Sequence, residues 1–242
     1  MYSFVGSGTN NSAGNDYSFI GNGCKNIISG FSSLSFIGSG VCNTISCYSA
    51  GSTLSGGYCN NICNAGASVI GGGYCNNVFA CGGTSVIGGG CQNVACGQFS
   101  AVSGGFQAKT YLYGQHANAS GQFSAIGDAQ SSYMVARKVA TLNASGTSIM
   151  SLDGTGVTGL IIPDGNNRSW NVTVEWVIVC TILGTGTSGS LAVGGTHTGT
   201  DTFYFIRVGG TSSISAITNV SSHNTSGMAS SDVTITVGAS QE

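Results

Sequence analysis

The N-terminal half of the chain repeats one short pattern of apolar and polar positions. An apolar residue opens a Gly-rich segment at Val5, Ile20, Ile37, Leu54, Ile70, Ile87, Val102, Tyr113 and Ile126, at intervals of 11 to 17 residues. Ser stands two residues before this column in eight of the nine units, and Asn stands six residues after it in the first six. Such a period is too short for a helix pair and fits two short strands joined by tight turns. The pattern predicts a parallel β-roll or β-solenoid of about nine repeats over residues 1–130.

Two columns of the repeat are expected to hold the roll together. Neighbouring residues of a strand point to opposite faces, so the apolar column is expected to point inwards. Gly and Asn tolerate the positive φ of sharp corners, so the Asn column is expected to stack in register, with each amide able to bond the next. The members of these two columns are Ile20, Ile37, Leu54, Ile70 and Ile87, and Asn26, Asn43, Asn60, Asn76 and Asn93.

The residues directly before the apolar column are apolar as well. They are Phe4, Phe19, Phe36, Val69, Val86 and Leu112. A roll two strands thick buries only one face of each strand, so this second set is expected to lie open to water unless another subunit covers it. The pattern predicts a homo-oligomer and leaves the choice between twofold and threefold symmetry open.

The pattern of apolar and polar residues changes near residue 131. Eight short segments of alternating apolar and polar residues follow, separated by Gly, Ser and Asn. They predict an antiparallel β-sandwich, of jelly-roll type, over residues 131–242. In the longest segment Trp170, Val172, Val174 and Trp176 share one face, which is typical of a half-buried strand with both tryptophans in the core.

Composition narrows the function classes. Charged residues make up 6% of the chain, and the net charge is −2 with no basic run. The chain therefore lacks the basic surface that binding to nucleic acid requires. No apolar stretch reaches the length of a membrane span, and the first residues lack an export signal. We expect a chain without membrane insertion that is made in a cytoplasm.

Ten cysteines stand out, nine of them in the first half, and from CNTISC onwards they come as one pair per turn. Three states compete: reduced thiols buried in the core, disulfides within or between turns, and a thiolate metal site. A reducing compartment favours reduced core thiols. A metal site needs ligands that converge once, which a repeated column does not provide, so no metal or other cofactor is expected.

Candidate catalytic groups are sparse. A glycosidase needs two carboxylates held about 5–9.5 Å apart, and the roll offers only Asp16 and Asp128 near its two ends. The three histidines are not accompanied by a nucleophile elbow of the G-x-S-x-G type. The sequence therefore predicts a non-enzymatic protein.

Two resemblances suggest a function. Units such as SVIGGGYCN, residues 68–76, resemble the head repeats of trimeric autotransporter adhesins, which build a left-handed β-roll with three chains side by side. The run AQSSYMVARKVATLN, followed by SLDGTGVTGLIIPDGNNRSWNVTVEWVIV, resembles a C-terminal β domain of bacteriophage tail fibres and receptor-binding proteins. Together they imply a homotrimeric fibre in the virion, joined to other tail proteins, with its last domain at the distal end. The implied partner is a glycan or an outer-membrane protein on a bacterial surface.

Polar loops carried by the second half are the candidate receptor contacts, because they combine His or Arg with hydroxyl and amide groups. The residues are Asn166, Asn167 and Arg168, then Thr196, His197 and Asp201, and finally His223 and Asn224. Solvated turns without a binding role are the alternative for each loop. Two other functions stay open: the head domain of a cellular adhesin, and a solitary β-solenoid that binds a flat lattice such as ice, although the repeat lacks the regular Thr row suited to a lattice.

Overall fold

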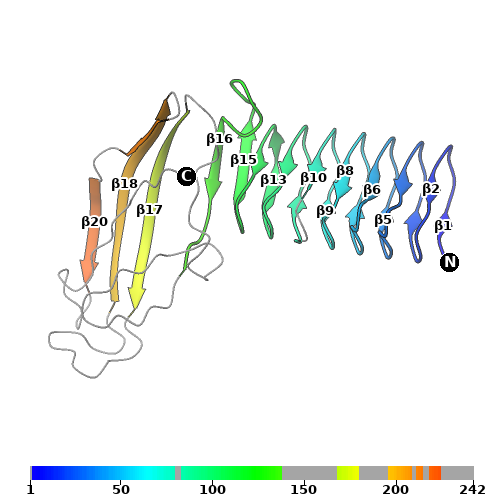
Figure 1. The fold of residues 1–242 in the computed structure, drawn as a ribbon, viewed down its shortest axis with the longest axis horizontal. Helices are drawn as coiled ribbons and strands as arrows, with labels where there is room; N and C mark the ends of the chain where they lie inside the picture. The colour runs from blue at the N-terminus through cyan, green and yellow to red at the C-terminus, as the bar shows by residue number, and fades with distance from the viewer. Residues whose placement is uncertain are drawn as a thin grey trace. The chain divides into compact units, whose positions relative to one another are not determined.

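The computed structural model describes residues 2–79, 83–137, 168–179, 196–208, 211–214 and 218–224. All regular elements in these ranges are β-strands (Figure 1). The chain divides into two compact units, one holding the described residues up to 137 and the other those from 168 onwards. The all-β prediction is confirmed for this part of the chain.

The first unit is a parallel β-solenoid of about seven turns, in which each turn contributes one strand to each of two sheets (Figure 1). The first sheet contains β1 (Phe4–Val5), β3 (Phe19–Ile20), β5 (Phe36–Ile37), β7 (Thr53–Leu54), β9 (Val69–Ile70), β11 (Val86–Ile87), β13 (Ala101–Phe106) and β15 (His116–Ser120), ending with β16 (Gln130–Tyr133). The second contains β2 (Ser12–Ala13), β4 (Ile27–Ile28), β6 (Thr44–Ser46), β8 (Asn61–Cys63), β10 (Asn77–Val78), β12 (Val94–Ala95) and β14 (Lys109–Thr110).

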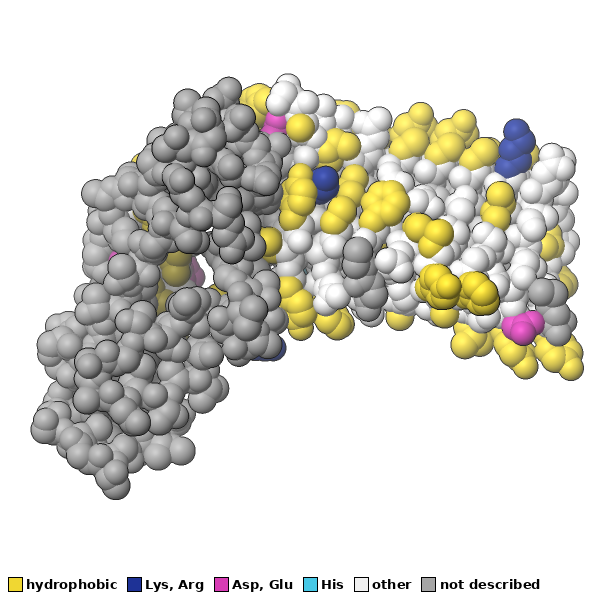
Figure 2. Space-filling model, viewed as in Figure 1, with side chains coloured by type: hydrophobic (Ala, Val, Ile, Leu, Met, Phe, Trp, Pro, Cys, Tyr) yellow, Lys and Arg dark blue, Asp and Glu magenta, His cyan; other side chains and the backbone are white. Residues whose placement is uncertain are grey.

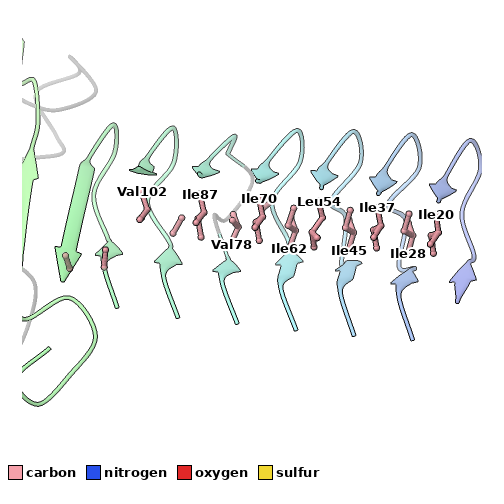
Figure 3. Close-up of a cluster of buried hydrophobic side chains, with 14 residues drawn as sticks. Ile20, Ile28, Ile37, Ile45, Leu54, Ile62, Ile70, Val78, Ile87 and Val102 are labelled. Carbon is pink, nitrogen blue, oxygen red and sulfur yellow. The ribbon is translucent and has the colours of Figure 1, made fainter. Parts of the chain in front are cut away.

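The core is a single file of apolar side chains between the two sheets (Figure 3). Ile20, Ile37, Leu54, Ile70, Ile87 and Val102 come from the first sheet, and Ile28, Ile45, Ile62, Val78 and Ala95 from the second; all of them are fully buried. β-Branched residues dominate the core positions of both sheets because they pack well on a pleated surface. The predicted inward column therefore lies in the core from Ile20 to Val102.

The last two predicted members of that column are wrong. Val102 pairs with Ala117 rather than with Tyr113, and Ile126 lies outside the strands. The Ser position before the column is here taken by Gln115, whose buried Oε1 accepts hydrogen bonds from the Tyr111 and Leu112 amides at 2.8 and 3.1 Å. β16 then pairs antiparallel with β15, so the first sheet has eight parallel strands where the sequence predicts nine repeats.

The Asn column forms a continuous internal ladder. Oδ1 of Asn43 accepts the backbone N–H of Asn60 at 3.1 Å, and Oδ1 of Asn60 accepts that of Asn76 at 2.9 Å. Nδ2 of Asn60 donates to the carbonyl oxygens of Gly56 and Gly73 at 3.0 and 2.9 Å. The same contacts recur for Asn26, Asn43, Asn76 and Asn93, all fully buried. Each side chain thus satisfies backbone groups in its own turn and the next.

Glycine is required where the turns stack most closely. Gly57 has a φ of 93°, and a Cβ on it would lie 2.3 Å from the carbonyl oxygen of Gly73 in the next turn. No L-residue side chain fits that space without moving the backbone. The Gly-rich segments therefore serve close packing of turns.

The second unit is described as one antiparallel sheet. It contains β17 (Arg168–Val179), β18 (Thr196–Val208), β19 (Thr211–Ile214) and β20 (Thr218–Asn224), with β17, β19 and β20 all pairing with β18. Along β17, Asn171, Thr173 and Glu175 are exposed while Trp176 is buried, which confirms the predicted alternation. Trp176 is in the core as predicted; the side chain of Trp170 lies outside the described residues.

Candidate functional site

An uncovered apolar row runs along the outer face of the first sheet. Phe4, Phe19, Phe36 and Val86 keep 57%, 38%, 39% and 40% of their surface exposed, and Val69 is half-buried. We call Phe4, Phe19, Phe36, Val69 and Val86 the apolar row. Figure 2 shows hydrophobic side chains, in yellow, in several separate clusters on the visible face of the solenoid.

In-register pairing of parallel strands builds the apolar row. Phe4 pairs with Phe19, and Phe19 with Phe36, so the three rings stack with centroids 5.3 Å apart. The prediction that Leu112 is the last member of this set is wrong, because the position beside Ala101 is occupied by His116. The error arises because the sequence alignment placed Tyr113 in the column, whereas the structure keeps an ordinary interval of 15 residues from Val102 to Ala117, so His116 precedes the column.

Two further aromatic stacks line the corners of the roll, and the sequence reading missed them. Tyr58 and Tyr74 stack at 5.4 Å with almost half of each side chain exposed, and Phe31 and Tyr48 stack at 5.2 Å and are more exposed still. A signal for the first pair is present in the sequence, since the hexapeptide GGYCNN occurs at both 56–61 and 72–77. Identical hexapeptides in adjacent turns place identical side chains one above the other.

The predicted receptor residues lie in strands where the structure describes them, and not in loops. His197 of β18 pairs with Asn224 of β20, and the next residue, Thr198, pairs with His223. Thr196 begins β18 opposite Val179, so Thr196, His197, His223 and Asn224 share one end of the sheet. We call these four residues the strand-end group, because the strand register places them at the same end of β18 and its two neighbours.

The remaining predicted contacts are not part of that group. Arg168 pairs with Arg207 at the opposite end of β17, ten residues along β18 from His197, or about 33 Å at strand rise. Asn166 and Asn167 lie outside the described residues. Asp201 is 6% exposed and its Oδ2 accepts a hydrogen bond from Trp176 Nε1 at 2.9 Å. A buried carboxylate engaged with a core indole fits an internal structural role better than a surface contact.

The described cysteines line the outside of the solenoid, so the prediction of buried core thiols is wrong. Of the eight described cysteines, Cys47 is exposed and the other seven are partly exposed, so none of the eight is buried. Cys42, Cys59 and Cys75 occupy the same corner position in successive turns, each with a φ of 53–57° that turns its side chain away from the core. Among the described residues, no three His, Cys, Asp or Glu side chains are grouped to hold a metal ion.

Asp128 anchors the loop that follows β15. Its carboxylate accepts the backbone N–H groups of Phe123, Ser124 and Ala125 at 2.8, 2.7 and 2.8 Å, and the Ser124 hydroxyl at 3.1 Å. Desolvation acts to raise the pKa of Asp128, but the hydrogen bonds from Ser124, Phe123 and Ala125 outweigh it and lower the pKa to about 2. A carboxylate held in this way stabilises a turn and is a poor proton donor near neutral pH.

Comparison with known proteins gives no family: no protein-family model, curated protein or solved structure matches the sequence. In the described part of the chain, no helix has the length and apolar character needed to cross a membrane. A functional assignment therefore depends on the apolar row and on the strand-end group of the second unit.

Proposed function

We propose that this chain is the receptor-binding part of a trimeric bacteriophage tail fibre, which adsorbs to a glycan or an outer-membrane protein on a bacterial surface without covalent chemistry. In this proposal the solenoid is the stiff shaft. The second unit, completed as an antiparallel sandwich, is the distal tip of the fibre in the virion. The resemblances of the repeats and of residues 129–179 to adhesin heads and fibre tips support the same function.

The apolar row is the observation that carries the proposal. Its five side chains are uncharged and follow the strand register, interrupted once by Thr53, and four of them are exposed in the single chain. Exposed apolar side chains gathered on one face of a protein mark an interaction surface. Packing three copies of the row about one axis would cover all of them with the same contact and close the assembly.

The strand-end group of the second unit supports a binding tip. Thr196, His197, His223 and Asn224 are neighbours in strand register, although they come from two segments of the chain. Hydroxyl, imidazole and amide groups donate and accept hydrogen bonds, which is what sugar hydroxyls and exposed peptide loops require. In strand register His197 and Asn224 belong to one face of the sheet and His223 to the other, so the proposed contact lies at the sheet end and not on a single face.

Molar mass in solution tests the assembly. Light scattering of the full chain is expected to give three times 24.1 kDa. Phe19→Asp places a charge in the apolar row and is expected to yield monomer, because three charges would meet at the axis. Ile27→Asp is the matched control: Ile27 is 39% exposed against 38% for Phe19, but it lies on the second sheet. A monomeric parent chain, or a trimer that survives Phe19→Asp, contradicts the proposal.

Adsorption to cells tests the tip separately. Alanine at His197 and His223 is expected to reduce retention of the trimer on bacterial cells, while alanine at Glu175, exposed in the middle of β17, leaves it unchanged. Equal retention of all three proteins, with trimer mass preserved, would place the receptor contact elsewhere on the chain.

A further inference from the structure

Two thiols lie on neighbouring turns, at the C-terminal ends of two adjacent strands in the middle of the second sheet. Ser46 of β6 pairs with Cys63 of β8, and Cys47 directly follows Ser46, so Cys47 and Cys63 are diagonal neighbours across the strand pair. Strand spacing and rise place their Cα atoms roughly 6 Å apart. A disulfide accepts Cα separations of about 4.4–6.8 Å, so the backbone geometry suits a bridge between the two turns.

The two thiols differ in environment. Cys47 is exposed at the surface, and its pKa is lowered by hydrogen bonds from the Cys63 thiol and from Ser46. The pKa of Cys63 is raised by burial, by its hydrogen bond to Cys47 and by the negative charge on Cys47. Of the two thiols, Cys47 is therefore the more accessible and the more readily ionised, and Cys63 is the hydrogen-bond donor beside it. A nucleophile next to a resolving thiol is the arrangement of redox-sensitive cysteines.

We propose that Cys47 and Cys63 form a redox-active dithiol, which a two-electron oxidant such as hydrogen peroxide converts into a disulfide linking two adjacent turns. The Cys47 thiolate attacks one peroxide oxygen, the O–O bond breaks, and hydroxide leaves and is protonated to water. The Cys63 sulfur then attacks the resulting sulfenic acid of Cys47. The S–O bond breaks and its hydroxyl leaves with the Cys63 proton as a second water, so two thiols are oxidised and one peroxide is reduced.

This modification is independent of the proposed fibre function. It acts on the third and fourth turns of the second sheet, whereas the apolar row lies on the first sheet. A solenoid is stabilised only by contacts between neighbouring turns, so a covalent link between two turns resists local opening. The dithiol would remain reduced in a cytoplasm and close once the protein meets an oxidant outside it.

Peptide mapping of the oxidised full chain tests the site. The chain is treated with hydrogen peroxide under native conditions, remaining thiols are alkylated with iodoacetamide, and chymotrypsin cuts between the two cysteines, where Tyr48 and Tyr58 lie. The expected product is a peptide pair joined through Cys47 and Cys63 and lighter by two hydrogens. Cys47→Ser and Cys63→Ser are each expected to abolish it. The matched controls Cys42→Ser and Cys59→Ser are expected to retain it, since these thiols occupy a different corner of the same turns.

Alkylation kinetics provide a second readout. At neutral pH the reaction of Cys47 with iodoacetamide is expected to slow several-fold in Cys63→Ala, which removes the donor, and to be largely preserved in Cys63→Ser, which keeps one. Circular dichroism identifies any variant that does not fold. The proposal is overturned if Cys47 ends as sulfinic acid while Cys63 stays open to alkylation, if Cys47 bridges another cysteine, or if neither thiol reacts.

Discussion

Removal of one rung of the Asn ladder should destabilise the solenoid strongly. In Asn60→Ala, the backbone N–H of Asn76 loses its acceptor, Oδ1 of Asn60, which lies at 2.9 Å. The carbonyl oxygen of Gly56 loses the Nδ2 donor at 3.0 Å, while that of Gly73 still accepts the Tyr58 amide at 2.9 Å. The substitution therefore leaves one fully buried donor without a partner and removes further hydrogen bonds from a site closed to water.

The magnitude follows from these contacts. An unsatisfied buried donor costs about 1–3 kcal/mol, and each lost hydrogen bond contributes a net of about 0.5–1.5 kcal/mol. With one orphaned N–H and the two Nδ2 bonds to Gly56 and Gly73, the free energy of unfolding should fall by roughly 2–6 kcal/mol. Local opening at the Asn76 amide should become at least about thirtyfold more frequent, since 2 kcal/mol is worth that factor.

Two measurements check this prediction. Urea unfolding followed by circular dichroism measures the loss in the free energy of global unfolding. Hydrogen exchange at the Asn76 amide measures the loss in the free energy of local opening. Asn61→Ala is the matched control, because Asn61 is the next residue, partly exposed on the outer face of β8, and should change stability by less than about 0.5 kcal/mol. Equal effects of the two substitutions would refute the reasoning, because burial in the ladder would then be irrelevant to the role of the amide.

Three other predictions concern turns, pH and oxidation. Gly57→Ala, which puts a Cβ 2.3 Å from a carbonyl oxygen of the next turn, should lower the thermal midpoint far more than Gly51→Ala, where φ is also positive but the space is open. The Asp128 loop should be stabilised above pH 3.8 and lose that contribution as pH falls towards 2, and hydrogen exchange should show no such pH dependence in Asp128→Asn. The Cys47–Cys63 disulfide encloses a loop of about 16 residues. It should raise the free energy of unfolding, measured by urea denaturation, by roughly 3 kcal/mol.

The inner positions of the roll were predictable because they obey one rule in every turn. The Ile column and the Asn column each have a single environment, so alternation and turn chemistry were enough to place Ile37 or Asn43. The prediction failed after Val102, where the interval to Ala117 is still 15 residues but the residue two positions before the column is no longer Ser. Gln115 replaces Ser by reaching two backbone amides with a longer side chain, and a pattern of residue types does not reveal that substitution.

The outer positions were less predictable, and the cysteines show why. Spacing alone put Cys47 and Cys63 in one column, yet Cys47 stands two residues after the inward Ile45 whereas Cys63 stands one residue after Ile62. That offset of one residue makes the two thiols diagonal neighbours. In the second unit, the strand register pairs His197 with Asn224 and places Asp201 beside Trp176. That register depends on pairing between distant segments of the chain, which local alternation does not specify.

The contrast between inner and outer positions also indicates where function resides in the solenoid. The inward residues of β3, β5 and β7 are Ile20, Ile37 and Leu54, nearly the same in size, whereas their outward neighbours change from two Phe rings to Thr53. The outward positions can change without disturbing the core, because each contacts only its neighbours in adjacent turns and the surrounding medium. Three Phe rings stacked at successive outward positions stabilise one another, yet they remain 38–57% exposed in the single chain, and the proposed subunit interface would cover them. It follows that an outward change such as Phe19→Asp should affect assembly while the turns stay folded, whereas a polar residue in place of the adjacent inward Ile20 should unfold them.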